Sequence, residues 1–167
     1  ALQGIRDLMG LVSEAALPAD QIDAVKMGTT VATNALLERK GDRTLLVVTC
    51  GFRDQLRIAY QARPRLFDQH IVLPEMLYER IEEVTERVDA NDNIIVPLDL
   101  DDLEPRLRSA YDDGICAIAI VLMHGYRFTA HEQKIAALAK TIGFSQISTS
   151  HATSPMIKFV GRGDTTV

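Results

Sequence analysis

Two nearly continuous apolar runs, Thr44–Cys50 and Ile115–Met123, constrain the fold of this chain more than any other feature. A strand that is apolar on both sides of its pleat must be covered on both faces, as strands are in parallel α/β sheets. Stretches with the apolar spacing of amphipathic helices lie between and beside these runs. The sequence therefore predicts an α/β fold built from strand–helix–strand units.

Helix and strand signals fill most of the chain around these runs. The opening residues have apolar side chains at intervals of three and four up to Ala16, which predicts a helix ended by Pro18. The other predicted elements of the first half are the strand Ile22–Met27, the helix Val31–Lys40 capped by Gly41, and the strand Thr44–Cys50. The second half adds a helix from its N-cap Asp99 to Asp113, which stops at Gly114, the strand Ile115–Met123, the helix His131–Ile142 ended by Gly143, and the strand Gln146–Ser150.

The middle of the chain has a mixed pattern. Residues 53–59 indicate a short helix. Further on, Tyr78–Val88 carries apolar residues among many charges, and Asn91–Asn93 is a turn signal before Ile94–Val96. These features predict a β-hairpin on the surface, inserted between the two α/β units.

Composition excludes several classes of protein. The 167 residues are 47% hydrophobic and carry a formal net charge of -5, which argues against a general nucleic-acid binder. No apolar run approaches the roughly 20 residues of a membrane span, and no secretory signal opens the chain. Cys50 and Cys116 lie in the apolar runs, so we expect buried, reduced thiols and a cytoplasmic protein. Because the chain begins at Ala1 within a helical pattern, we expect a piece of a longer polypeptide, incomplete at both ends.

The first candidate site lies where the strand Ile22–Met27 leads into the next helix. Its residues are Gly28, Thr29, Thr30, Thr33 and Asn34. Backbone N–H groups, hydroxyl donors and a glycine that admits close approach are features of an anion site. The alternative is a threonine cap on an ordinary helix. No Walker lysine is present, which excludes the P-loop class.

The second and third candidates lie in the last third of the chain. Arg162 to Thr166 combines glycine, hydroxyl and carboxylate groups that could contact phosphate or a metal-bound water, and the alternative is a flexible tail. His124 follows a predicted buried strand, where α/β sheets place ligands. A metal bound by His124, His131, Glu132 and His151 is disfavoured because the spacing matches no standard zinc motif. A hydrogen-bonded His124 and a helix-capping role for His131 and Glu132 are preferred, and no serine or cysteine nucleophile motif is present.

Several of these segments together resemble the N-terminal domain of the hydantoinase A / 5-oxoprolinase family. Gly28–Arg39 is the most specific match. The Gln61–Asp68 stretch and Leu122–His124 are nearer to the 5-oxoprolinases than to the acetone-carboxylase relatives. Two departures are Gly125, where relatives often carry serine, and the absence of the family's first phosphate motif, an acidic residue followed by Gly-Gly-Thr. The other matching segments are Gly51–Asp54, Ala130–Gln133 and Arg162–Thr166.

The resemblance implies an ATP-dependent amidohydrolase with an actin-like (ribonuclease H-like) ATPase fold. Such an enzyme phosphorylates the amide oxygen of 5-oxo-L-proline or a hydantoin, and the ring then opens to give glutamate, ADP and phosphate. ATP and Mg²⁺ are the implied cofactors, with glutathione metabolism as the setting. The implied nucleotide or phosphate contacts are Gly28, Thr29, Thr30, Thr33, Asn34, Gly163, Thr165 and Thr166. Asp164 would be catalytic, His124 would bind substrate or be structural, and no residue is assigned as a metal ligand.

The same resemblance implies an organisation and a set of partners. Residues 1–167 would be a fragment of the N-terminal domain, inactive alone, with residues 164–167 starting the following hydantoinase A domain. We expect a cyclic amide substrate, a hydantoinase B-type domain or subunit and a homo-oligomer, and neither nucleic acid nor membrane as a partner. The alternatives are the ATP-using subunit of an acetone or acetophenone carboxylase and a non-catalytic α/β interaction module.

Overall fold

The computed structural model describes residues 2–12, 14–22, 24, 30–61, 65, 67, 69–73 and 75–167. The chain divides into two compact units, Ala1–Glu38 and Arg39–Val167. The first unit contains the helix α1 (Leu2–Leu8), the 3-10 turn η1 (Ala19–Gln21) and the helix α2 (Val31–Leu37). The second unit contains all of the described strands.

Both helices of the first unit end earlier than the sequence predicts. After α1, Gly10 takes a positive φ of 67°, and the Leu11 N–H bonds the Arg6 carbonyl at 2.9 Å, so the chain turns well before Pro18. After α2, Arg39 rather than Gly41 takes the left-handed conformation. The predicted strand Ile22–Met27 lies mostly outside the described residues, and Ile22 and Ala24, which are described, are not in a strand.

The second unit is built on a parallel sheet with strand order β2-β1-β5-β6. The two central strands, β1 (Thr44–Thr49) and β5 (Ala117–Val121), are the predicted apolar runs, and both are buried almost throughout. The predicted parallel α/β fold is therefore confirmed. The outer strands are β2 (Arg80–Val84) and β6 (Gln146–Thr149).

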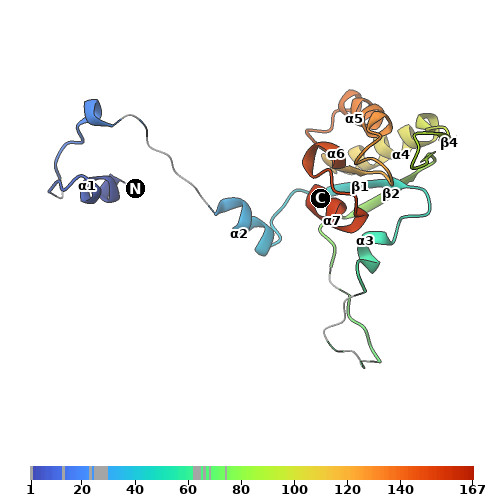
Figure 1. The fold of residues 1–167 in the computed structure, drawn as a ribbon, viewed down its shortest axis with the longest axis horizontal. Helices are drawn as coiled ribbons and strands as arrows, with labels where there is room; N and C mark the ends of the chain where they lie inside the picture. Colours follow the sequence, from blue (N-terminus) through green and yellow to red (C-terminus); the bar gives the residue numbers. More distant parts are fainter. Residues whose placement is uncertain are drawn as a thin grey trace. The chain divides into compact units, whose positions relative to one another are not determined.

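Helices cover both faces of this sheet (Figure 1). On one face α4 (Leu100–Asp112) and α5 (Ala130–Ile142) bury the larger core, which includes Leu103, Leu107 and Ile135. On the other face α3 (Gln55–Ile58) and α7 (Phe159–Thr166) pack over Leu46, Val48 and Val121. The short helix α6 (Ser150–Thr153) follows β6 directly.

The predicted hairpin is only half right. β3 (Arg87–Val88) and β4 (Ile94–Val96) do form an antiparallel pair around the turn at residues 89–93. Arg80–Val84, however, joins the main sheet as β2, parallel to β1. Its charged side chains fit an edge strand because they find partners there: Glu82 accepts from Arg80 at 2.9 Å and from Arg106 at 3.2 Å.

Two further expectations need correction. Cys50 and Cys116 are both free, as expected, but both are exposed, because each lies just beyond the end of its strand. Arg162–Thr166 is neither a tail nor a turn, since it belongs to α7 and Arg162 is fully buried. No helix among the described residues is long and apolar enough to cross a membrane.

Candidate functional site

The carboxyl ends of the parallel strands bring a set of buried polar side chains to one edge of the sheet. In open α/β sheets this edge is where ligands bind. Thr49 ends β1, and Ser150 follows β6. The buried polar residues of the described chain are Thr49, Glu86, His131, Glu132, Ser150, Arg162 and Thr166.

A first network links the ends of β1 and β5 to helix α5. The Thr49 hydroxyl donates to Oε1 of Glu86 and accepts from the Met123 N–H at 3.0 Å. The second carboxylate oxygen of Glu86 accepts from Nδ1 of His131 at 2.8 Å. Because both carboxylate oxygens are occupied, the network satisfies the buried Glu86 and holds the start of α5 against the loop after β2.

A second network centres on Glu132, which is fully buried. Its Oε1 accepts from the Leu122 N–H at 3.0 Å and from the Ser150 hydroxyl at 2.5 Å. Its Oε2 accepts from the backbone N–H of His151 at 3.1 Å and from Nδ1 of the same residue at 2.7 Å. These bonds place the proton on Nδ1 and leave Nε2 of His151 as the unprotonated nitrogen when the ring is neutral.

Gly125 is required by this second network. A Cβ at Gly125 would overlap the Glu132 carboxylate. The absence of a side chain therefore lets the loop after β5 approach the buried carboxylate closely.

Arg162 ties α7 to the same edge. Its guanidinium donates to the carbonyl oxygens of Leu122, Met123 and Met156, the last two at 3.1 Å. The group also lies 5.4 Å from the ring centroid of Tyr126. Burial lowers the pKa of Arg162, and the nearby Glu132 carboxylate opposes this shift. Arg162 is thus a buried cation with a structural role: it donates hydrogen bonds to the two carbonyls that follow β5 and to the Met156 carbonyl before α7.

The rest of the predicted segment lies on α7 with different surroundings. Gly163 is buried against Leu56 of α3, and a Cβ there would meet the leucine methyl groups. The hydroxyls of Thr165 and Thr166 donate to backbone carbonyls one turn earlier, at 2.8 and 2.7 Å. Asp164 is exposed, its side chain has no hydrogen bond within the described part of the chain, and partial desolvation raises its pKa.

The predicted nucleotide contacts near α2 belong to the first unit. Thr30 is the N-cap residue of α2, and its side chain makes no capping hydrogen bond. Thr33 and Asn34 are exposed on the helix. Gly28 and Thr29 lie outside the described residues.

The histidines do not gather. Nδ1 of His124 donates to the Val88 carbonyl at 2.7 Å, which confirms a hydrogen-bonded His124, whereas His131 bonds Glu86 and His151 bonds Glu132. The capping role expected for His131 and Glu132 is wrong, because both side chains are committed to the networks at the sheet edge. The described residues include no group of histidine, cysteine and carboxylate side chains that could hold a metal ion.

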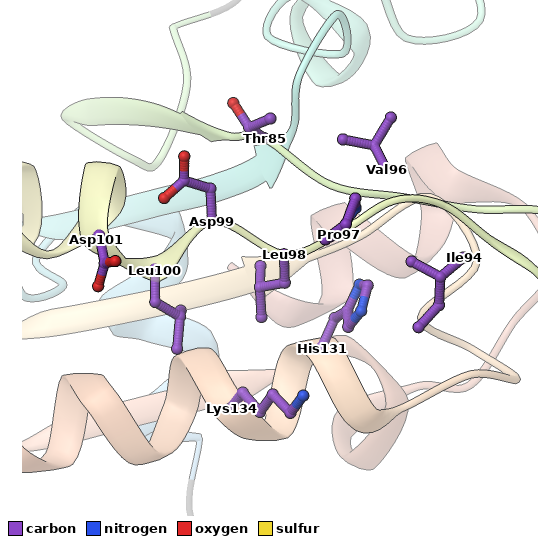
Figure 2. A pocket seen from close by; sticks show the side chains of 10 residues that line it. All are labelled: Thr85, Ile94, Val96, Pro97, Leu98, Asp99, Leu100, Asp101, His131 and Lys134. Carbon is purple, nitrogen blue, oxygen red and sulfur yellow. The ribbon is translucent and has the colours of Figure 1, made fainter.

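A cavity of about 620 Å³ lies between α5 and the segment that joins β4 to α4. Figure 2 shows the His131 ring beneath this segment, with Leu98 on one side and Ile94 on the other. Lys134 and Asp101 supply charges at its border. The cavity is mainly apolar and reaches the first network through His131.

Sequence reasoning missed Thr49, Glu86 and Ser150 as members of the buried edge. The signal that could have found Thr49 and Ser150 is positional, since both are hydroxyl residues at the carboxyl ends of apolar strands. Glu86 had no such signal, because it lies among the charges of the presumed hairpin.

Several known proteins are similar to this chain in sequence or in fold. The chain is 44% identical over 166 residues to 5-oxoprolinase 1 of Arabidopsis thaliana, covering 88% of this chain and 13% of that protein. It is 32% identical over 168 residues to the acetophenone carboxylase gamma subunit of Aromatoleum aromaticum, covering 91% of this chain and 23% of the subunit. The crystal structure of an ATP-dependent caprolactamase from Pseudomonas jessenii superimposes with a TM-score of 0.78 at 25% identity, over 99% of this chain and 24% of that one.

The chain therefore spans about an eighth of the plant 5-oxoprolinase, 13% of its length. Residues 1–143 match the family model described as the hydantoinase/oxoprolinase N-terminal region. That match extends over most of the chain and includes Gly28–Arg39 and most of the other segments that carried the resemblance. The chain belongs to the hydantoinase/oxoprolinase family and represents its N-terminal region.

Proposed function

We propose that this chain is part of an ATP-dependent enzyme that opens a cyclic amide, with 5-oxo-L-proline as the substrate and glutamate as the product. The observation that carries the proposal is the 44% identity to a 5-oxoprolinase. The fold shared with an ATP-dependent caprolactamase supports it, because that name describes the same chemistry on another lactam. An unstrained lactam is a poor electrophile, and phosphorylation of its oxygen by ATP would activate the carbonyl carbon to attack by water. The ring C–N bond would then break, with the nitrogen taking a proton, and a second water would hydrolyse the resulting acyl phosphate to the carboxylate and phosphate.

The roles of individual residues belong to the same proposal. Gly28, Thr29, Thr30, Thr33 and Asn34 would contact the nucleotide phosphates, on the strength of the resemblance. The exposed carboxylate of Asp164 is the kind of hard oxygen donor that Mg²⁺ prefers, so the residue fits the role of orienting a water on the ion. Bound Mg²⁺ would neutralise charge on the transferred phosphoryl group. An actin-like ATPase fold remains part of the proposal, supported by the parallel α/β sheet.

The test is phosphate release by the complete enzyme with different substrates. Purified enzyme is incubated with ATP and either 5-oxo-L-proline, hydantoin, or acetophenone with bicarbonate. We expect phosphate release above the substrate-free rate with 5-oxo-L-proline, and a much slower rate for Asp164→Asn at unchanged thermal stability. Stimulation by hydantoin instead would keep the cyclic amidase and change its substrate, and stimulation by no cyclic amide would refute the proposal.

A second candidate function is that of the ATP-using subunit of a ketone carboxylase. The identity of 32% to the acetophenone carboxylase gamma subunit favours it. Phosphate release that requires both acetophenone and bicarbonate would select this alternative. The name of that relative also records a multi-subunit enzyme, and we propose a hydantoinase B-type partner and a homo-oligomeric assembly here. Copurification of a tagged complete enzyme with its partner would test the assembly.

A further inference from the structure

The cavity between α5 and the segment that joins β4 to α4, which we call the α5 cavity, is large enough for a small ligand. Its volume of about 620 Å³ falls within the range of small-molecule pockets, about 300–1,000 Å³. Part of its wall is uncovered, since Ile94 is 60% exposed and Val96 is 37% exposed. A ligand with an apolar body would be stabilised by covering this wall. The apolar lining residues are Ile94, Val96, Pro97, Leu98 and Leu100.

The His131 ring offers one unused nitrogen to the α5 cavity. The residue is only 6% exposed, and its Nδ1 bonds the Glu86 carboxylate at 2.8 Å. Nε2 has no hydrogen-bond partner among the residues that the structure describes, and the ring lines the cavity between Leu98 and Ile94 (Figure 2). Because an ionised carboxylate only accepts, Nδ1 carries the proton, and Nε2 of the neutral ring is an acceptor. The cavity therefore presents an acceptor to a ligand N–H group.

Lys134 supplies a positive charge one helical turn after His131. Both residues lie on the stretch of α5 that lines the cavity (Figure 2). Lys134 is exposed, and its ammonium group has no hydrogen bond or ion pair within the described ranges. Residues three apart on a helix are neighbours, with about 5–6 Å between their Cβ atoms. A ligand can therefore reach both side chains with two groups attached to the same carbon atom.

Carboxylates border the cavity at the start of α4. Asp99 is already committed, because its Oδ1 accepts from the Asp102 N–H at 3.0 Å. Asp101 makes no hydrogen bond or ion pair with any residue of the described chain. Its negative charge disfavours a simple anion and favours a ligand that also carries an ammonium group.

We propose that the α5 cavity binds a free α-amino acid with an apolar side chain. Lys134 pairs with the carboxylate of this ligand, Nε2 of His131 accepts from its ammonium group, and the apolar wall covers its side chain. The inference goes beyond the proposed function, because neither the proposed substrate nor the proposed product has all three features. 5-Oxo-L-proline has no ammonium group, and glutamate would place a second carboxylate against the apolar wall.

Calorimetry with the complete enzyme tests this inference without requiring turnover. L-Leucine would be compared with two analogues that keep its branched body: 4-methylpentanoate lacks the ammonium group, and 3-methylbutylamine lacks the carboxylate. We expect leucine to bind about tenfold more tightly than either analogue, since a hydrogen bond to a charged group contributes roughly that factor.

Two variants assign each charged group of the ligand to its residue. Lys134→Gln should lower the affinity for leucine by about tenfold and leave that for 3-methylbutylamine unchanged, because this amine has no carboxylate to pair. His131→Asn keeps a donor toward Glu86 and removes Nε2, so it should weaken the binding of leucine but not of 4-methylpentanoate. The matched control is Lys140→Gln, an exposed lysine in the last turn of the same helix, which should change neither affinity.

Several outcomes would overturn the inference. One is that the wild-type enzyme binds neither leucine nor phenylalanine, a bulkier apolar amino acid. Another is an equal loss of affinity for leucine and 3-methylbutylamine in Lys134→Gln. Competition between leucine and 5-oxo-L-proline would also overturn it, by assigning the cavity to the substrate site. If His131→Asn did not fold, Lys134→Gln would still decide, because this substitution removes no hydrogen bond or ion pair of the described chain.

The same measurements separate this inference from the proposed function. Leucine binding that depends on Lys134, in an enzyme that opens no lactam, would uphold the inference and refute the proposed function. Lactam-dependent turnover by an enzyme without affinity for apolar amino acids would do the reverse.

Discussion

At the residue scale, the contact between Gly125 and the buried Glu132 gives the sharpest expectation. In Gly125→Ala the new methyl group would overlap the carboxylate that holds Leu122, Ser150 and His151. We expect a loss of about 1–3 kcal/mol in the free energy of unfolding, as overpacked sites show.

The matched control for this prediction is Gly41→Ala. Gly41 has no positive φ, and nothing lies within 4 Å of a Cβ built there. Its effect should stay within about 0.5 kcal/mol. Urea unfolding measures both variants, and equal stabilities would contradict the close approach at Gly125.

Sequence reasoning at this scale found several of the right residues but few of their partners. It singled out Arg162 as part of a segment with glycine, hydroxyl and carboxylate groups, and it weighed His131, Glu132 and His151 as metal ligands, a role it disfavoured. Their bonds cross long stretches of chain, such as the 40 residues between Arg162 and Leu122, and no local spacing encodes such a contact. The sequence therefore placed Arg162 in a phosphate-binding segment, whereas in the structure its side chain is buried and donates to backbone carbonyls.

At the scale of single elements, the N-cap of α4 is the first test. Oδ1 of Asp99 accepts from the Asp102 N–H at 3.0 Å. Asp99→Ala should lower the free energy of unfolding by about 1 kcal/mol, because it leaves a helix N–H without its cap. Asp99→Asn keeps a capping oxygen and should lose much less. If both variants lost the same stability, the capping account would be wrong.

The β3–β4 hairpin gives a pH-dependent expectation. The Asp89 carboxylate accepts from the side chain and backbone of Asn93 and from the Asn91 N–H, and these bonds hold its pKa below the ordinary value of 3.8. A depressed pKa means that the carboxylate stabilises the turn at pH above 3.8 and that this support disappears as pH falls through the lower, folded value.

Carboxyl chemical shifts measured by NMR across this pH range would report the titration of Asp89. Asn93→Ala removes the largest of the three contributions and should move the pKa of Asp89 upward. A pKa that is the same in both proteins would show that the side chain of Asn93 does not hold the turn.

Elements with strong apolar periodicity were predictable, and those shaped by tertiary contacts were not. The strands β1 and β5 and the helices α4 and α5 follow from buried runs, caps and terminal glycines. By contrast, the charges of β2 favour an exposed hairpin arm in the sequence. In the structure β2 pairs with the backbone of β1, and its Glu82 accepts from Arg106. The helix α7 was missed because its two glycines and its threonines favour a turn, and packing of Gly163 on Leu56 overrides that preference.

At the scale of the whole molecule, residues 1–167 form one region of a family whose members are much longer. They correspond to 13% of the plant 5-oxoprolinase and 24% of the caprolactamase chain. We therefore expect residues 1–167 alone to hydrolyse no ATP in the presence of 5-oxo-L-proline. Lactam-dependent phosphate release by this segment alone would show that all essential groups lie within it.

The most direct test of the central claim measures both products of the complete enzyme in one reaction. Glutamate and phosphate are quantified together after incubation with 5-oxo-L-proline and ATP, and again with either substrate omitted. An ATP-dependent cyclic amidase predicts that the two products appear in equal amounts and that glutamate does not form without ATP. Glutamate formed without ATP, or phosphate released at a rate that does not depend on the lactam, would contradict the account.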